Sequence, residues 1–261
     1  MEDFINGKRG RGPEELLGTG TLPGGRIKTW RKRMASNYRF TYGVDLVFCI
    51  DATGSMGPLL DTVKANALNL YRDLMKIMDR KNKRVEQVRI RIIAFRDYKY
   101  DQETAMMVTD FFRLPDEEKA FEASLRSIVP EGGGDDPEDG LEALAYAIRS
   151  PWDTSSQRKR HVIVVWSDDG THKLGFGSDA PNYPRGMAKD FNELTMWWGN
   201  ASAPGLMDQN AKRLLLFTPD KDDWNLIRNN WNQTIQYVSE AGSGLESCDY
   251  EQIINAIANS I

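Results

Sequence analysis

The chain has 261 residues, enough for one large domain or two small ones, and its 40% hydrophobic and 28% charged residues are typical of a globular protein. Its mean hydropathy of −0.54 and its lack of any apolar run near the roughly 18 residues that span a bilayer indicate that it is not a membrane protein. Cys49 and Cys248 form neither a zinc pattern nor a disulfide framework, and the start Met-Glu-Asp-Phe lacks the features of a signal peptide, so we expect a cytoplasmic protein.

Charge is unevenly distributed along the chain. Residues 1–43 hold nine Lys or Arg against four Asp or Glu, a net of +5, so residues 44–261 carry −9 of the total of −4. This arm is rich in glycine and poor in apolar periodicity, and we expect it not to fold alone. We favour a solvated extension that wraps its own acidic domain; the alternative is a basic arm for nucleic acid or an acidic partner.

The remaining 218 residues alternate between strand and helix patterns. In chain order, we expect a strand at 44–50, a helix at 56–78, strands at 88–95 and 105–112, helices at 116–128 and 137–149, strands at 161–166, 213–217 and 234–238, and a helix at 250–261. The connection to the segment at 105–112 is short, which indicates an antiparallel edge strand. The pattern therefore predicts an α/β fold: a doubly wound, Rossmann-like, mainly parallel six-stranded sheet with one antiparallel edge strand and helices on both faces.

An insertion at about 172–212 separates two of these strands, and connections of this length are often functional. We expect a helix at 189–198 with Phe191, Leu194 and Trp198 on one face. Two interpretations stay open: these aromatic side chains dock the insertion on the domain, or they bind a partner.

The segment Asp51-Ala52-Thr53-Gly54-Ser55 follows the first apolar strand and precedes a helix. In an open α/β sheet this position lies in the crevice at the carboxyl end of the strand. One carboxylate and two hydroxyls suit a hard divalent cation such as Mg²⁺, with Mn²⁺ and Ca²⁺ as alternatives.

This segment resembles the first motif of the metal-ion-dependent adhesion site in von Willebrand factor A domains, and two further loops occur in the family's order. Asp135, in the glycine-rich loop 132–138, matches the family's second metal loop, and Asp168, after the strand at 161–166, matches its last acidic residue. The resemblance covers about residues 44–261 and implies a metal set of Asp51, Thr53, Ser55, Asp135 and Asp168. Within this family, the chain resembles the free-standing, intracellular, bacterial type.

The resemblance implies a module that binds a partner protein through Mg²⁺, as an adaptor in a multi-component assembly whose partner is an ATPase or a component of a defence or stress system. Nucleic acid and membrane are not expected as partners. Three carboxylates around a divalent ion leave the site near −1, which favours metal retention over recruitment of an acidic ligand.

Five residues are expected beside the metal or on the ligand-binding face: Arg96, Asp97, Asp136, Asp169 and His172. Arg96 offsets the excess negative charge or pairs with Asp97. Asp136 is expected as the N-cap of the helix at 137–149, with Pro137 at the first helical position. His172 lies four residues beyond Asp168 and could reach the cation, but we expect a solvated loop histidine.

An enzymatic function is the main competing hypothesis. Asp51-Ala52-Thr53-Gly54 also resembles the motif of hydrolases that form an aspartyl phosphate, which would make the protein a Mg²⁺-dependent phosphoryl-transfer hydrolase using Asp51. Those enzymes place a second Asp two residues after the nucleophile, where this chain has Thr53, so we expect a protein that is not an enzyme. A metal-independent scaffold with a nucleic-acid-binding arm is the third hypothesis.

Overall fold

The computed structural model describes residues 16–21, 27–32, 41–132, 137–242, 245 and 249–261. The chain divides into two compact units, Met1–Arg39 and Phe40–Ile261. In the first unit, strands β1 (Leu16–Thr21) and β2 (Ile27–Lys32) pair antiparallel as a hairpin. This hairpin was not predicted, because its two six-residue strands carry little of the periodicity that marks a longer strand.

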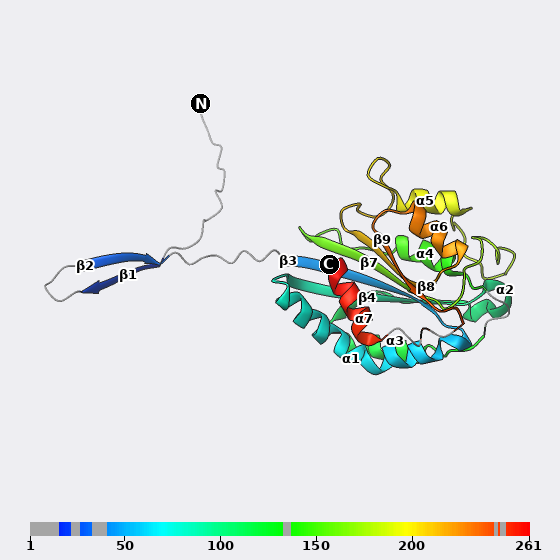
Figure 1. Cartoon of the computed structure of the whole chain (residues 1–261), viewed down its shortest axis with the longest axis horizontal. Helices are drawn as coiled ribbons and strands as arrows, with labels where there is room; N and C mark the ends of the chain where they lie inside the picture. The colour runs from blue at the N-terminus through cyan, green and yellow to red at the C-terminus, as the bar shows by residue number, and fades with distance from the viewer. Residues whose placement is uncertain (1–15, 22–26, 33–40, 133–136, 243–244, 246–248) are drawn as a thin grey trace, which may run out of the picture. The chain divides into compact units, whose positions relative to one another are not determined.

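The second unit is a sheet covered by helices on both faces (Figure 1). Its elements are β3 (Thr41–Asp51), η1 (Gly54–Met56), α1 (Gly57–Arg80), β4 (Arg84–Phe95), α2 (Tyr98–Asp101), η2 (Gln102–Thr104), β5 (Met106–Val108), β6 (Phe112–Leu114), α3 (Glu118–Ser127), α4 (Gly140–Ile148), β7 (Lys159–Trp166), α5 (Phe191–Trp198), β8 (Lys212–Pro219), α6 (Asp222–Asn230), β9 (Thr234–Ser239) and α7 (Tyr250–Ser260). No helix in the described ranges is long and apolar enough to cross a membrane.

Within the described residues the sheet has seven strands, in the order β5-β4-β3-β7-β8-β9, with β6 also paired to β4. The pairs β4–β3–β7–β8–β9 are parallel, and β5 and β6 are antiparallel to β4. This confirms the predicted doubly wound, mainly parallel sheet. The single edge strand expected at 105–112 is instead two short strands separated by residues 109–111, where the Ile92 N–H donates to the Thr109 hydroxyl at 3.0 Å.

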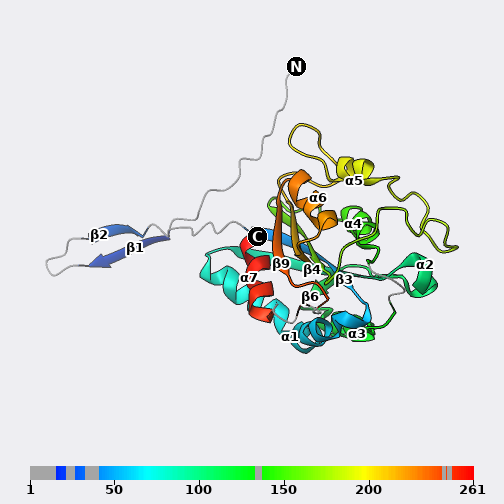
Figure 2. The ribbon, with the colours of Figure 1, turned by 45° about the vertical axis from the view of Figure 1, so that its right-hand side comes forward.

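Two apolar cores form, one on each face of the sheet. α1, α3 and α7 cover one face, and α4, α5 and α6 cover the other, as the views in Figure 1 and Figure 2 agree. The helix expected at 56–78 is confirmed, and its apolar residues at spacings of three and four are all buried: Met56, which ends η1, and Leu60, Val63, Ala67, Leu70, Leu74 and Met78 of α1. β3 is buried along nearly its whole length because both its faces are covered.

The parallel strands all end at the same edge of the sheet. In Figure 1 this edge lies on the right, beside α2, and α1 starts from it. Ile50 of β3 pairs with Trp166 of β7, and Asp51 pairs with Phe95 of β4. The loops that leave β3, β4 and β7 are therefore neighbours, and this arrangement positions the candidate site.

Candidate metal centre

Asp51 is the fully buried centre of a hydrogen-bond network at the end of β3. Its Oδ1 accepts from the backbone N–H of Thr53 at 3.0 Å and from the Thr53 hydroxyl at 2.6 Å, and its Oδ2 accepts from the Ser167 hydroxyl at 2.9 Å. Burial raises the pKa of Asp51 to about 6; the hydrogen bonds from Thr53 and Ser167 oppose this, and the charge of Asp168 adds to it.

Ser55 connects this network to the loop after β7. Its hydroxyl donates to Asp168 Oδ1 at 3.0 Å and lies 3.5 Å from the Thr53 hydroxyl. Asp168 is buried, whereas Ser55 is exposed. Four of the five predicted metal ligands are thus brought together: Asp51, Thr53, Ser55 and Asp168. Asp135, the fifth, lies outside the described residues, as does Asp136.

The donor set fits a hard divalent cation, because two carboxylates and two hydroxyls gather where a buried carboxylate resists ionisation. A cation there would compensate the charge of Asp51 and Asp168. Ser167 was not among the predicted site residues, although its position beside Asp168 was an available signal.

Arg96 organises the loops at this edge and does not act on the carboxylates through any described contact. Its guanidinium donates to four backbone carbonyls, those of Ala52 (3.1 Å), Thr104 (2.6 Å), Val129 (2.7 Å) and Glu131 (2.7 Å). Arg96 is only 8% exposed. It therefore connects the loop after β3 to the segments before β5 and after α3, instead of pairing with Asp97 as one interpretation proposed.

Among the described residues, Asp169 contacts this network only through its backbone, whose carbonyl accepts from the Ser167 hydroxyl at 3.2 Å. Its carboxylate forms an ion pair with Lys221, and its carbonyl accepts from the Trp224 indole at 2.7 Å. These contacts tie the loop after β7 to the start of α6, which the sequence analysis did not predict.

His172 is buried, so the expectation of a solvated loop histidine is wrong. Its Nδ1 lies 3.2 Å from Asp97 Oδ2 and 3.3 Å from Asp139 Oδ1. Its ring stacks on Phe176, with centroids 3.8 Å apart. His172 and Asp97 thus belong to a second cluster with Asp139, which the sequence analysis missed.

The expected start of the helix at 137–149 is wrong by three residues. α4 begins at Gly140 with Asp139 as its N-cap residue, and Pro137 precedes the helix. The turn from 137 to 139 instead makes an isolated bridge between Glu138 and Thr171. Asp139 and Glu138 are consequently buried, whereas a helix from 137 would have placed them in its first turn.

Two further buried carboxylates lie near the second cluster. Burial is the main cause that raises the pKa of Glu138 to about 9, and the negative charge of Asp51 is the second cause. Burial likewise raises the pKa of Glu142 to about 7, with the negative charge of Asp139 as the second cause. Glu142 Oε1 accepts from the Gly175 N–H at 2.7 Å and the Tyr183 hydroxyl at 2.9 Å. This end of the sheet therefore has an acidic interior.

The insertion packs on the domain through its aromatic side chains. Trp198 is fully buried, stacks on Trp231 at 5.1 Å, and donates to the Asn232 carbonyl at 3.0 Å. Phe191 also stacks on Trp231, at 6.0 Å. Of the two interpretations of these residues, docking of the insertion accounts for these contacts.

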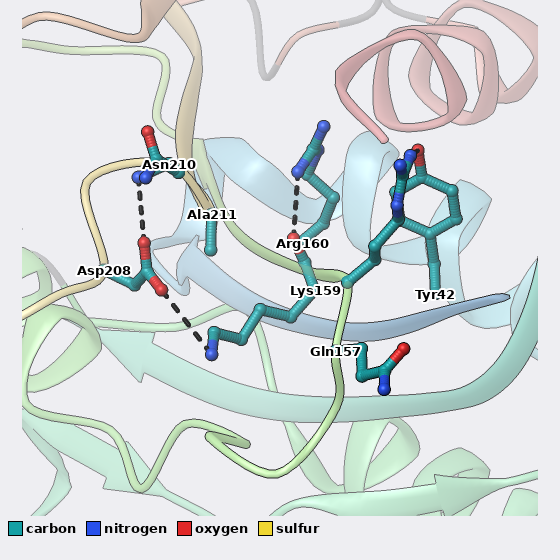
Figure 3. A pocket seen from close by; sticks show the side chains of 8 residues that line it. Tyr42, Gln157, Lys159, Arg160, Asp208, Asn210 and Ala211 are labelled. Atoms are coloured by element: carbon teal, nitrogen blue, oxygen red, sulfur yellow. Dashed lines mark hydrogen bonds and ion pairs between the residues drawn. The ribbon is translucent and has the colours of Figure 1, made fainter. Parts of the chain in front are cut away.

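A cavity of about 320 Å³ lies at the opposite end of the strands, where β3 and β7 begin (Figure 3). Its lining includes Tyr42 and Arg160, with 5.5 Å between the guanidinium carbon and the ring centre, and the ion pair of Lys159 with Asp208 at 3.5 Å. Tyr42 precedes Asp51 by nine residues of β3, about 30 Å at the rise of a strand. This basic cavity is separate from the candidate metal centre.

Residues 45–157 match the family model described as the von Willebrand factor A domain. No curated protein matches the chain.

Similar solved structures include the pilus adhesin SpaC from Lactobacillus rhamnosus GG in its open conformation, at 14% identity over 84% of this chain and 30% of that chain, with a TM-score of 0.46. A von Willebrand factor type A protein from Catenulispora acidiphila matches at 12% identity over 84% of this chain and 43% of that one, with a TM-score of 0.46. The von Willebrand factor domain of the type V pili tip protein Mfa5 from Porphyromonas gingivalis matches at 14% identity, over 84% and 96%, with a TM-score of 0.44. The chain spans less than half of the first two proteins.

Proposed function

We propose that this domain binds a partner protein through a divalent cation held at the carboxyl ends of β3 and β7. The observation that carries the proposal is the hydrogen bond from Ser55 to Asp168 at 3.0 Å, which joins the two loops beside the buried Asp51. Asp51, Thr53, Ser55 and Asp168 would hold the ion, together with Asp135 from the glycine-rich loop. Mg²⁺ is the proposed ion, since all of these donors are oxygens.

The residues of this centre differ in their roles: some orient the ligands, and the carboxylates set its net charge. Thr53 and Ser167 hold the Asp51 carboxylate by three hydrogen bonds, so its orientation is set before an ion arrives. Ser55 is exposed at the surface of the centre, where a partner would approach. When bound, the cation would supply a positive charge that attracts an oxygen ligand of the partner. Three carboxylates leave the centre near −1, so contacts beyond the ion are part of the proposed recognition.

We propose a binding role and not phosphoryl transfer. An aspartyl nucleophile needs an acid nearby, and the residue two positions after Asp51 is Thr53, whose hydroxyl donates to Asp51. A phosphatase assay with a generic phosphate ester, with and without Mg²⁺, separates the two functions: turnover that needs both Mg²⁺ and Asp51 would contradict the binding role. The adaptor role and the cytoplasmic location stay predictions from the sequence.

Affinity capture from extracts of the source cells tests the proposed function. The bait proteins are wild type with Mg²⁺, wild type with EDTA, Asp51→Ala, and the matched control Asp61→Ala, which removes an exposed carboxylate on α1. A partner retained by wild type and by the control, and lost with EDTA and with Asp51→Ala, supports the proposal. The same retained proteins in all four arms would refute metal-dependent binding.

A further inference from the structure

Three segments bring Asp97, Asp139 and His172 together beneath the surface. Asp97 follows β4, Asp139 precedes α4, and His172 lies in the loop after β7. Both carboxylates are fully buried and His172 is 7% exposed. One oxygen of each carboxylate and the His172 Nδ1 lie within 4.8 Å of one another. The three side chains therefore converge on one point, as metal ligands do.

The backbone orients both carboxylates toward that point. Asp97 Oδ1 accepts from the Lys99 N–H at 2.5 Å, and Asp139 Oδ2 accepts from the Tyr98 N–H at 2.7 Å. This leaves Asp97 Oδ2 and Asp139 Oδ1 facing His172, and neither atom accepts a hydrogen bond in the described part of the chain. Outer contacts that fix a ligand's orientation are typical of metal sites.

The positive charge of a protonated His172 cannot alone compensate the charge of two ionised carboxylates. If Nδ1 carries a proton, the one nitrogen faces two carboxylate oxygens, at 3.2 Å and 3.3 Å. Even with a charged imidazole, the three groups carry a net −1 in a buried position, which is costly without a further cation. A divalent ion bound by two carboxylates and a neutral imidazole would make the cluster neutral.

The spacing suits a small ion with short bonds. A tetrahedral ion with Zn–N and Zn–O bonds of about 2.0–2.1 Å separates its ligands by about 3.3 Å. The distances from Nδ1 to the two carboxylate oxygens are 3.2 and 3.3 Å. An imidazole donor also favours zinc and related transition metals over Mg²⁺.

We propose that Asp97, Asp139 and His172 form a second metal site, for Zn²⁺ or a similar transition-metal ion, separate from the oxygen-only centre at Asp51. His172 also lines a mainly apolar cavity of about 390 Å³ with Leu174 and Phe191. Three protein ligands leave a coordination position for water or for a group of a molecule bound in this cavity. This inference does not depend on the proposed function of the Asp51 centre.

Calorimetric titration with Zn²⁺ tests the site, using untagged protein in the Asp51→Ala background so that the first centre does not contribute. We expect one Zn²⁺ per chain. Adding His172→Gln should lower the affinity at least about tenfold, the smallest loss seen when even an outer partner of a ligand is removed. His161→Gln is the matched control, because His161 is buried at the opposite end of β7. Equal Zn²⁺ affinity with the His172 and His161 substitutions, or no Zn²⁺ binding before either, would overturn the proposal.

Nitrogen NMR of the imidazoles in the Asp51→Ala protein gives a result even if the His172 variant fails to fold. The chain has only two histidines, so the two ring systems are assigned by comparison with the His161 variant. We expect Zn²⁺ to shift the Nδ1 resonance of His172 and to leave His161 unchanged. Zn²⁺ binding that shifts neither imidazole would refute the site.

Discussion

Replacing Arg96 tests whether one buried guanidinium holds together the loops at the carboxyl ends of the parallel strands. In Arg96→Met, the carbonyls of Thr104, Val129 and Glu131 lose a hydrogen bond from a charged donor, and each such bond contributes about 1.5–3 kcal/mol. The Ala52 carbonyl keeps a partner, the Glu131 N–H at 3.1 Å. Since the three losses are not fully additive, we expect the free energy of unfolding to fall by about 3–5 kcal/mol.

Urea denaturation followed by circular dichroism measures this loss. The control is Arg126→Met, which removes an exposed ion pair with Glu122 one helical turn away, worth about 0.3–0.5 kcal/mol. Arg96→Lys should recover only part of the loss, because a single amine cannot reach carbonyls on three sides. If Arg96→Met lowers the free energy of unfolding no more than Arg126→Met does, the proposed role of Arg96 is wrong.

Glu142 and Trp198 give two further predictions from the structure, and Asp135 gives one from the sequence. Glu142→Gln should stabilise the metal-free protein by about 3 kcal/mol above pH 7 and leave its stability unchanged near pH 4. The pKa of Glu142 is about 7 in the folded protein and 4.5 in the unfolded chain, so the wild type loses stability as the pH rises between these values. Thermal melts at several pH values check this prediction. Asp135→Thr should weaken Mg²⁺ binding and strengthen binding of a carboxylate-containing peptide, with Asp136→Ala as the control; equal Mg²⁺ affinities of the two variants would contradict the assignment of Asp135. Trp198→Ala should lower the free energy of unfolding by about 3–5 kcal/mol, against less than about 0.5 kcal/mol for Met196→Ala, whose side chain is 66% exposed; equal losses by urea denaturation would contradict docking of the insertion.

The sheet and the candidate metal centre at its carboxyl end could be predicted because the sequence patterns that indicate them are local. The apolar runs of β3 and β7 each stop at a short polar segment, and the carboxyl ends of parallel strands meet at one edge. The proximity of Asp51, Ser55 and Asp168 follows from that geometry.

The second cluster could not be predicted, because burial of its carboxylates depends on packing between distant segments. Pro137 indicated a helix start, which placed Asp139 on a solvated first turn. In the structure, the backbone N–H of His172 donates to the Glu138 carbonyl at 2.8 Å and ties residues 138–139 to the loop after β7. α6 was missed for a different reason: only Trp224 and Ile227 are buried along it, which is too few to show a helical period.

The central claim is that the carboxyl ends of β3 and β7 hold a divalent cation. Calorimetric titration of wild type, Asp51→Ala and Asp168→Ala with Mg²⁺ tests it most directly, with circular dichroism to confirm that each variant is folded. We expect Mg²⁺ to bind wild type and to show no measurable binding to either folded variant. Mg²⁺ affinity equal to that of wild type in both variants would contradict the account.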